Sequence, residues 1–383
     1  MKLSDCHSIE DFRKLSKKKL PSPIFDYIDG GSDDEITLDR NTYSFNKCDL
    51  IPNVLTGLGS EVDLSTTVLG QKIDFPLFLA PTSMQRLFHR GGEKETAKAA
   101  EKMGTMFSMS TMATTSIEEI SKVSSGPKLF QLYIHKDRGL TDSLIERCKK
   151  SNFNSMCLTV DTIVAGNRER DLRSGFTTPV RLKLNSLASF IMHPKWSLNY
   201  FLGKKFQLEN IIHTTEIGSN IEKSVMEYIN EQFDPSMSWK DAEYCVKKWG
   251  GPFALKGVMS VDDAHKAVDI GCTAIMVSNH GGRQLDGSRA PFDQLAEIVE
   301  AVGDKVEVIL DGGIRRGTHV LKALALGAKA CSFGKGYLHA LAVGGEKGVI
   351  SVLKNMRNEI NRNMILMGCK NFKELNKNKI RYR

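Results

Sequence analysis

Eight short apolar runs constrain the fold of this chain more than any other feature of its sequence. They cover residues 76–83, 106–111, 128–133, 155–161, 252–258, 274–280, 306–313 and 330–335. Most are followed by a segment with helical spacing, for example 92–103, 138–150, 261–270, 292–302 and 318–326. Near-continuous apolar strands are typical of parallel sheets, which are covered on both faces. Eight strand–helix units therefore predict an α/β protein with a closed (β/α)8 TIM barrel, and a doubly wound open sheet is the main alternative.

Residues that can hydrogen-bond a ligand stand at the end of nearly every run. They are Thr82, Ser110, Gln131 with Tyr133, Thr159 with Asp161, Lys256, Ser278 with His280, Asp311, and Gly334 with Lys335. Each one alone is compatible with an ordinary turn. A TIM barrel, however, has its active site at the carboxyl ends of its strands, so the barrel prediction brings all of these groups together.

The spacing of the runs is irregular at one place, between Asp161 and Pro252. Elsewhere the runs start about two to three dozen residues apart, as barrel units do. Residues 177–238 are therefore expected to be an insertion after strand four, either a partly helical lid or a membrane-contacting segment. The insertion mixes Phe190, Trp196, Tyr200, Phe201 and Phe206 with Arg181, Lys183, Lys195, Lys204 and Lys205. Residues 1–52 are expected to form an N-terminal helical extension with an ordered turn at 29–32, and residues 53–383 the barrel.

Composition narrows the class of protein. No apolar run reaches the roughly 18 residues that span a bilayer, and the polar, lysine-rich start lacks the apolar core of a secretory signal. The eight cysteines form no CxxC pair, which favours buried reduced thiols in a cytoplasmic protein over a disulfide framework or a metal site. The net charge of +8 is spread along the chain, with short clusters at 17–19 and 377–383. This charge favours anionic surfaces, membranes included, and gives little support to nucleic-acid binding.

The segment 275–286 suggests the chemistry. A strand-like run leads into His280, two glycines and Arg283. A neutral imidazole can act as a base near pH 7, and a guanidinium offers two parallel hydrogen bonds to a carboxylate. A base beside a carboxylate clamp indicates an enzyme that acts on a small organic acid. The alternative is a histidine that caps a turn beside a surface arginine.

Several separate motifs resemble the FMN-dependent L-2-hydroxy acid oxidases and dehydrogenases over nearly the whole chain. They are Phe25-Asp26-Tyr27 with Gly30-Gly31, Ala80-Pro81-Thr82, Phe130-Gln131-Leu132-Tyr133, Leu158-Thr159-Val160-Asp161 with Arg168, Leu255-Lys256-Gly257, and the stretches 278–286 and 311–317. Within the family the chain is most similar to the membrane-associated lactate and mandelate dehydrogenases, because of residues 193–196 and 233–235. The resemblance implies an FMN cofactor and a homo-oligomer, expected to be a homotetramer.

The resemblance also assigns the residues that contact FMN. They are Ala80, Pro81, Thr82, Ser110, Gln131, Thr159, Lys256, Ser278, Asp311, Gly312, Gly313, Arg315, Gly334 and Lys335. Lys256 is expected beside the pyrimidine ring, where a fixed ammonium stabilises developing negative charge. Arg315, the glycines and the helix that begins near Gly317 are expected to hold the phosphate. Lys335 departs from the family, which usually has arginine there, and a lysine lacks the bidentate fork.

For the substrate, the resemblance implies that Arg283 and Arg168 clamp the carboxylate and that Tyr27 adds a third donor. Tyr133 is expected to hydrogen-bond the 2-hydroxyl group. His280 is the expected base and Asp161 its partner, which orients the ring and stabilises the imidazolium. The same residues serve a carbanion route and a hydride route.

Met112 stands where plant-type glycolate oxidases have a bulky tryptophan beside the substrate. A flexible thioether there favours lactate or a larger 2-hydroxy acid over glycolate, although Met112 also suits plain barrel packing. The resulting expectation is an FMN-dependent L-2-hydroxy acid dehydrogenase, with L-lactate the best single substrate. It passes electrons to a quinone or another carrier on the cytoplasmic face of the inner membrane. The alternatives are a soluble oxidase that produces hydrogen peroxide and, more remotely, a flavin-dependent isomerase of the type 2 isopentenyl diphosphate isomerase kind.

Overall fold

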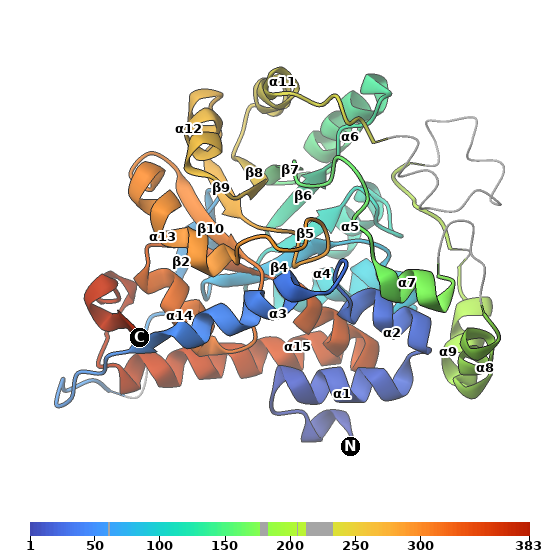
Figure 1. The fold of residues 1–383 in the computed structure, drawn as a ribbon, viewed down its shortest axis with the longest axis horizontal. Helices are drawn as coiled ribbons and strands as arrows, with labels where there is room; N and C mark the ends of the chain where they lie inside the picture. The colour runs from blue at the N-terminus through green and yellow to red at the C-terminus, as the bar shows by residue number, and fades with distance from the viewer. Residues whose placement is uncertain (60–61, 177–182, 205, 212–232) are drawn as a thin grey trace.

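A closed barrel of eight parallel strands forms the centre of the molecule (Figure 1). The computed structural model describes residues 1–59, 62–176, 183–204, 206–211 and 233–383. The barrel strands are β4 Leu77–Thr82, β5 Phe107–Ser110, β6 Lys128–Leu132, β7 Ser155–Thr159, β8 Phe253–Val258, β9 Ala274–Val277, β10 Glu307–Asp311 and β11 Ala330–Phe333. The prediction of a TIM barrel is confirmed. The open sheet is excluded because the eight strands form a closed ring, in which β4 joins β5 to β11 and no strand is left at an edge.

Most strands end before the polar residues that close the predicted runs. Tyr133, Asp161 and His280 therefore lie on loops that follow β6, β7 and β9. The sequence prediction extended these strands by one to three residues. The sequence alone does not distinguish a polar residue at the end of a strand from a polar residue in the turn that follows. The functional groups thus stand above the barrel wall.

Helices follow the strands and cover the barrel. They are α4 Gly92–Lys102, α5 Ile117–Val123, α6 Arg138–Lys150, α11 Trp239–Trp249, α12 Val261–Asp269, α13 Pro291–Val302, α14 Gly317–Ala325 and α15 Lys335–Leu366. Several begin at a residue suited to capping: Ser116 accepts from the backbone of Glu119, and Ser260 from that of Asp263. Helix α15 is kinked at Gly344 and Gly345. The helical segments predicted from spacing agree closely with these bounds.

The barrel interior alternates between core and site. On β6, Leu129 belongs to the interior core, and Gln131, two residues on, lines a cavity at the carboxyl end. On β8 the core residue Ala254 is likewise followed, two positions on, by Lys256 in the cavity wall. On β10, Ile309 in the core is followed in the same way by Asp311. Successive side chains of a strand point to opposite faces, so a spacing of two keeps a residue inside the barrel. At the amino end, the hairpin of β2 Thr66–Val68 and β3 Gln71–Ile73 contributes residues to the same core.

Among the described residues, three α-helices precede the barrel: α1 Ile9–Lys19, α2 Ser22–Asp29 and α3 Ile36–Tyr43. In Figure 1, α1 runs alongside α15, and the Ser16 hydroxyl lies 2.8 Å from Nδ1 of His339. The turn between α2 and α3 reaches the strand ends, where Ser32 N–H donates to the Gly282 carbonyl at 2.9 Å. The chain then forms β1 Cys48–Leu50, which pairs with the C-terminal strand β12 Ile380–Tyr382.

The expected insertion is partly helical in the residues that the structure describes. After α7 Glu169–Ser174 come α8 Leu184–Met192 and α9 Pro194–Phe201. Residues 177–182, 205 and 212–232, which belong to the predicted insertion, lie outside the described residues. Among the helices of the described chain, none is long and apolar enough to cross a bilayer.

All eight cysteines are buried free thiols, as predicted. Their positions are Cys6, Cys48, Cys148, Cys157, Cys245, Cys272, Cys331 and Cys369. Burial raises the pKa of every one of these thiols. They act as small apolar side chains in the core.

Candidate active site

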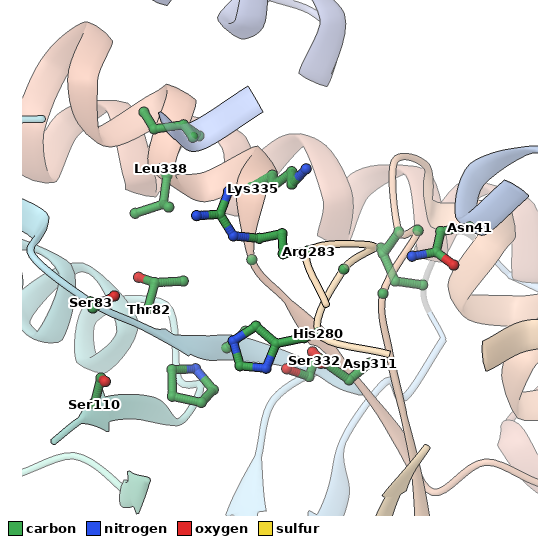
Figure 2. A pocket seen from close by; sticks show the side chains of 18 of the residues that line it. Asn41, Thr82, Ser83, Ser110, His280, Arg283, Asp311, Ser332, Lys335 and Leu338 are labelled. Carbon is green, nitrogen blue, oxygen red and sulfur yellow. The ribbon is translucent and has the colours of Figure 1, made fainter. Parts of the chain in front are cut away.

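A cavity lies at the carboxyl ends of the strands, and its space together with the open solvent at its mouth amounts to about 960 Å³. Sixteen of the predicted site residues line it: Tyr27, Ala80, Pro81, Thr82, Ser110, Gln131, Tyr133, Lys256, His280, Arg283, Asp311, Gly312, Gly313, Arg315, Gly334 and Lys335. Figure 2 shows Thr82 and Ser110 on one side of this cavity, Asn41 on the other, and His280 between them.

The other five predicted residues do not line the cavity, but each of them contacts a residue that does. Thr159 accepts a hydrogen bond of 2.6 Å from Gln131 Nε2, Ser278 donates one of 2.6 Å to Asp311, and Asp161 contacts His280. Arg168 lies over the ring of Tyr27 at 5.2 Å, and Met112 donates its backbone N–H to Ser110. The side chain of Met112 is buried and does not line the cavity, which favours the packing interpretation of this residue.

His280 and Asp161 form a close pair. Nδ1 of His280 lies 2.9 Å from Oδ1 of Asp161 and 3.2 Å from the hydroxyl of Thr162. Burial opposes ionisation of Asp161, but the charge and hydrogen bond of His280 and the charge of Lys256 outweigh it and lower the pKa of this carboxyl. Asp161 is therefore a carboxylate at neutral pH, which fixes one nitrogen of the imidazole.

Lys256 and Asp311 form a buried ion pair that faces the cavity. Lys256 Nζ lies 3.0 Å from Asp311 Oδ2 and 3.1 Å from the Ser278 hydroxyl. Burial acts against both charges, yet Asp311 and Asp161 raise the pKa of Lys256 above its usual value. In turn, Lys256 and the Ser278 hydroxyl lower the pKa of Asp311. Both groups are charged, so a fixed ammonium stands at the position where the resemblance places the flavin pyrimidine ring.

We expect Lys256→Met to destabilise the protein by about 3–5 kcal/mol at pH 7, because it leaves a buried carboxylate without its cation. In the native protein the pKa of Asp311 is lowered, so its stabilising effect is present above the usual aspartate pKa and is lost as the pH falls. In the variant, the charge of Lys256 no longer offsets the effect of burial, which raises that pKa, so protonation of Asp311 restores stability at low pH. The difference in unfolding free energy between the two proteins should therefore shrink between pH 7 and pH 4, measured by urea denaturation.

Lys128→Met is the matched control for this prediction. Lys128 is also a buried strand lysine, but its ammonium donates to the carbonyls of Ser124 and Gly126 rather than to a buried carboxylate. Its replacement should cost less stability, and the cost should lack that dependence on pH. A pH-independent loss in Lys256→Met would contradict the ion-pair account.

Three partly buried cations, Arg283, Arg315 and Lys335, gather at one end of the cavity. Lys335 Nζ donates to the carbonyls of Asp29 and Gly30 at 3.0 and 2.8 Å, and Arg283 Nη1 donates to those of Tyr27 and Gly30 at 2.6 and 3.2 Å. These carbonyls belong to the last turn and cap of α2, where the helix dipole is negative. Burial lowers the pKa of Arg283 and Arg315, and burial together with these two arginines lowers that of Lys335.

This end of the cavity suits an anion. The hydrogen bond found for the Arg315 side chain within the described residues goes to the Ile314 carbonyl, at 2.9 Å. Cations that are partly withdrawn from water favour an anionic partner, so Arg315 and Lys335 would suit the phosphate of FMN, and Lys256 would suit its ring system. Thr82, Ser110 and Gln131, at the ends of β4, β5 and β6, line the same cavity and would supply polar contacts to FMN.

Two details of the predicted phosphate loop differ from expectation. Gly313 has φ +74°, and a Cβ there would lie 1.8 Å from the carbonyl oxygen of Asn41, so close packing of α3 requires this glycine whatever the ligand. The first amide of α14, on Gly317, donates to Glu359 at 2.7 Å. That amide is already paired with a carboxylate, so the side chains of Arg315, Lys335 and Arg283 supply the positive charge at this end.

The sequence reasoning missed several residues of the cavity wall. They include Ile28, Leu38, Asn41, Ser83, Phe88, Gly281, Ile314, Ser332 and Leu338. The alternation on β11 could have found Ser332, which lies two residues before Gly334 and two after the core residue Ala330. No sequence signal marks Asn41, which reaches the site only because α3 packs at the barrel mouth.

Comparisons with known proteins agree with this geometry. The family model of the FMN-dependent dehydrogenases matches residues 16–382. The chain is 42% identical to an L-lactate oxidase of Nostoc, over 95% of each chain, and 40% identical to human 2-hydroxyacid oxidase 1, over 97% of this chain and 96% of that protein. Its structure resembles that of the monotopic membrane protein (S)-mandelate dehydrogenase, with a TM-score of 0.93 and 32% identity over 99% of this chain and all of that one.

A second solved structure, a mandelate oxidase with (S)-4-hydroxymandelic acid, matches with a TM-score of 0.85 and 32% identity over 99% of both chains. These relatives include both oxidases and a dehydrogenase, so they fix the class of reaction and leave the acceptor open. Three observations agree on one family. A family model spans most of the chain, the barrel has cationic groups suited to a phosphate, and one cavity has a histidine–aspartate pair at its wall. The chain belongs to the family of FMN-dependent dehydrogenases that oxidise 2-hydroxy acids, and FMN is its cofactor.

Proposed function

We propose that the enzyme oxidises an L-2-hydroxy acid to the 2-oxo acid, with L-lactate as the preferred substrate. The observation that carries the proposal is the His280–Asp161 pair at 2.9 Å, in contact with a cavity that Arg283, Tyr27 and Tyr133 also line. When bound, FMN supplies the two-electron acceptor that this oxidation needs. The name of the L-lactate oxidase relative favours lactate among the 2-hydroxy acids.

His280 is proposed as the base. Its Nδ1 faces the Asp161 carboxylate, so the neutral ring carries its proton on Nδ1 and leaves the lone pair of Nε2 free to accept a proton from the substrate. Asp161 then stabilises the imidazolium that forms. This arrangement can remove either the proton on C2 or the hydroxyl proton.

Arg283 is proposed as the main carboxylate ligand. Its guanidinium lies 4.9 Å from the centre of the Tyr27 ring and donates to backbone carbonyls, whereas Arg168 is paired with Asp171 at 2.8 Å. A carboxylate substrate would give Arg283 the anionic partner that carbonyls cannot supply. Burial, together with the charge of Asp161, raises the pKa of Tyr133, which keeps its hydroxyl protonated as a donor for the 2-hydroxyl of the substrate.

Anaerobic incubation of the FMN-loaded protein with single acids tests the substrate. L-lactate should bleach the yellow flavin faster than glycolate or L-mandelate does, and D-lactate is the control for handedness. A flavin that no 2-hydroxy acid bleaches would contradict the proposal and favour the isomerase alternative. Faster bleaching by glycolate or mandelate would keep the reaction and replace the substrate.

We further propose that the enzyme is a peripheral protein of the cytoplasmic membrane face, a homotetramer by family resemblance, and that it reduces a quinone. Helices α8 and α9 present large apolar side chains to solvent, including Leu184, Ile191 and Phe201, which are 84%, 72% and 80% exposed. Lys195 on α9 is exposed. It lies close enough to Lys19, at the basic end of α1, for its charge to help lower the pKa of Lys19. Apolar side chains rimmed by lysines suit the interface of an anionic bilayer.

We expect the triple variant Leu187→Ser, Ile191→Ser, Phe201→Ser to leave the membrane fraction while it keeps its activity with a soluble dye. The variant removes exposed apolar area but spares Trp196, whose indole N–H anchors α9 by donating to the Leu87 carbonyl at 2.8 Å. Flotation with anionic vesicles measures the release.

The control variant is Val54→Ser with Leu55→Ser, two apolar residues that are 79% and 101% exposed and precede β2. It should stay bound to vesicles, since these residues lie outside α8 and α9. If the native protein does not bind vesicles and forms peroxide as fast as it consumes lactate, the soluble oxidase is the correct alternative.

A further inference from the structure

The backbone that presents His280 has an unusual conformation. His280, Gly281 and Gly282 have φ angles of +57°, +69° and +73°, three successive residues in the left-handed region. A residue with a side chain seldom adopts this region unless its surroundings hold it there. The amide of His280 donates to the Ser278 hydroxyl, and the Gly282 amide lies 3.1 and 3.2 Å from the backbone and side-chain oxygens of Asn279. Asn279 therefore closes the turn.

Asn279 is held by a residue from outside the barrel. Its side-chain amide exchanges two hydrogen bonds, each 2.8 Å, with the side-chain amide of Asn41 on α3. The two side chains are 2% and 6% exposed. A buried amide that loses its partners keeps the full cost of desolvation, so this pair fixes the position of both residues.

Helix α3 and the His280 loop also pack as one unit. The Asp286 carboxylate accepts from the amides of Thr37 and Ile36, at 2.7 and 3.3 Å, and so caps the first turn of α3. A Cβ on Gly282 would lie 2.6 Å from the backbone nitrogen of Leu38, so the loop touches the helix backbone directly. A side chain on α3 can therefore act on the loop without contact with the substrate.

We propose that Asn41 is a positioning residue for His280, acting through Asn279. The proposal rests on His280 as the base of the proposed function. Without the Asn41 amide, the Asn279 side chain loses its two shortest hydrogen bonds and keeps only those to the Arg289 carbonyl and the Gly282 amide, each 3.2 Å. The left-handed turn then relaxes toward more common backbone angles. Relaxation moves the imidazole away from Asp161. A displacement of about 1 Å costs on the order of 100-fold in rate for a positioned group.

The test compares Asn41→Leu, which has a similar volume and no polar atoms, with Asn210→Leu. Asn210 is the matched control because it is a fully buried asparagine that accepts from the Ile117 amide at 3.0 Å and does not line the cavity. For each FMN-loaded variant we would measure hydrogen–deuterium exchange of residues 278–287, kcat, the affinity for FMN and the affinity for sulfite, which attacks the flavin itself.

Asn41→Leu should speed exchange in residues 278–287 and lower kcat on the order of 10–100-fold, with FMN and sulfite affinities changed no more than in the control. The same exchange and kcat in Asn41→Leu and Asn210→Leu would overturn the proposal. So would a loss of kcat that saturating FMN restores. If Asn41→Leu does not fold, Asn41→Asp replaces it, because the carboxylate still accepts from Asn279 but cannot donate, and it should show the same changes in smaller measure.

A double-mutant cycle separates action through Asn279 from a general loss of stability. If both residues act through one pair, Asn41→Leu combined with Asn279→Leu should cost no more kcat than Asn279→Leu alone. Additive losses would contradict the pathway through Asn279. Full turnover in His280→Gln would refute the base assignment, and the exchange measurement on Asn41→Leu would still decide whether this residue holds the loop.

Discussion

His280→Gln should keep FMN and lose turnover by on the order of 10²–10⁴-fold, the usual contribution of a positioned base. Glutamine resembles histidine in size and can still form hydrogen bonds, but its amide cannot take up a proton near neutral pH. The loss should appear in the rate of anaerobic flavin bleaching by L-lactate, measured by stopped flow. Absorbance of the purified variant checks that FMN remains bound.

Asp161→Asn gives a graded comparison for His280→Gln. The amide can still contact Nδ1, since the pair is 2.9 Å apart, but it carries no charge to stabilise the imidazolium. We expect a loss of turnover with FMN retained. Near-normal bleaching by His280→Gln would remove His280 as the base, whatever Asp161→Asn does.

Arg283→Met should mainly weaken substrate binding. A charge-assisted hydrogen bond is worth roughly 1.5–3 kcal/mol, and a guanidinium can make two to one carboxylate, so the affinity for lactate should fall by at least about one to two powers of ten. The measurement is the lactate concentration that gives half the maximal rate of flavin bleaching. Arg173→Met is the control, since Arg173 pairs with Glu169 at the surface of α7 and does not line the cavity.

Sulfite separates the carboxylate clamp from general damage to the site. If Arg283→Met still binds sulfite at the flavin but binds lactate poorly, the lost interaction belongs to the substrate carboxylate. Unchanged lactate affinity would refute the clamp. Loss of FMN itself would point instead to a part for Arg283 at the phosphate end, where its guanidinium lies near Lys335 (Figure 2).

The barrel and much of the cavity wall could be predicted because both follow from local pattern. Apolar runs of strand length mark the wall of the barrel, and the period of two along a strand places Lys256 and Asp311 inside, at the carboxyl end. The fold then turns eight separate strand ends into one site. None of these steps depends on a contact between distant parts of the chain.

The rest depends on contacts between distant parts of the chain. Asn41 and Asn279 are 238 positions apart, and nothing local to either position marks the pair. The hydrogen bonds of Lys335 and Arg283 to the end of α2 are of the same kind, because they arise only when the N-terminal helices pack at the barrel mouth. Sequence reasoning expected both side chains to face a ligand, and it had no means to see that a helix end also competes for them.

The burial of every cysteine has a practical consequence. The thiolate is the reactive form of cysteine, and burial raises the pKa of Cys157, Cys245 and Cys272 to about 12. Maleimides and peroxide should therefore react slowly with the native chain. A cysteine introduced in place of Ile191, on the exposed face of α8, would be the dominant target for a fluorophore. The native protein is thus already a low-background scaffold for labelling, and a dye at that position would report directly on contact with lipid.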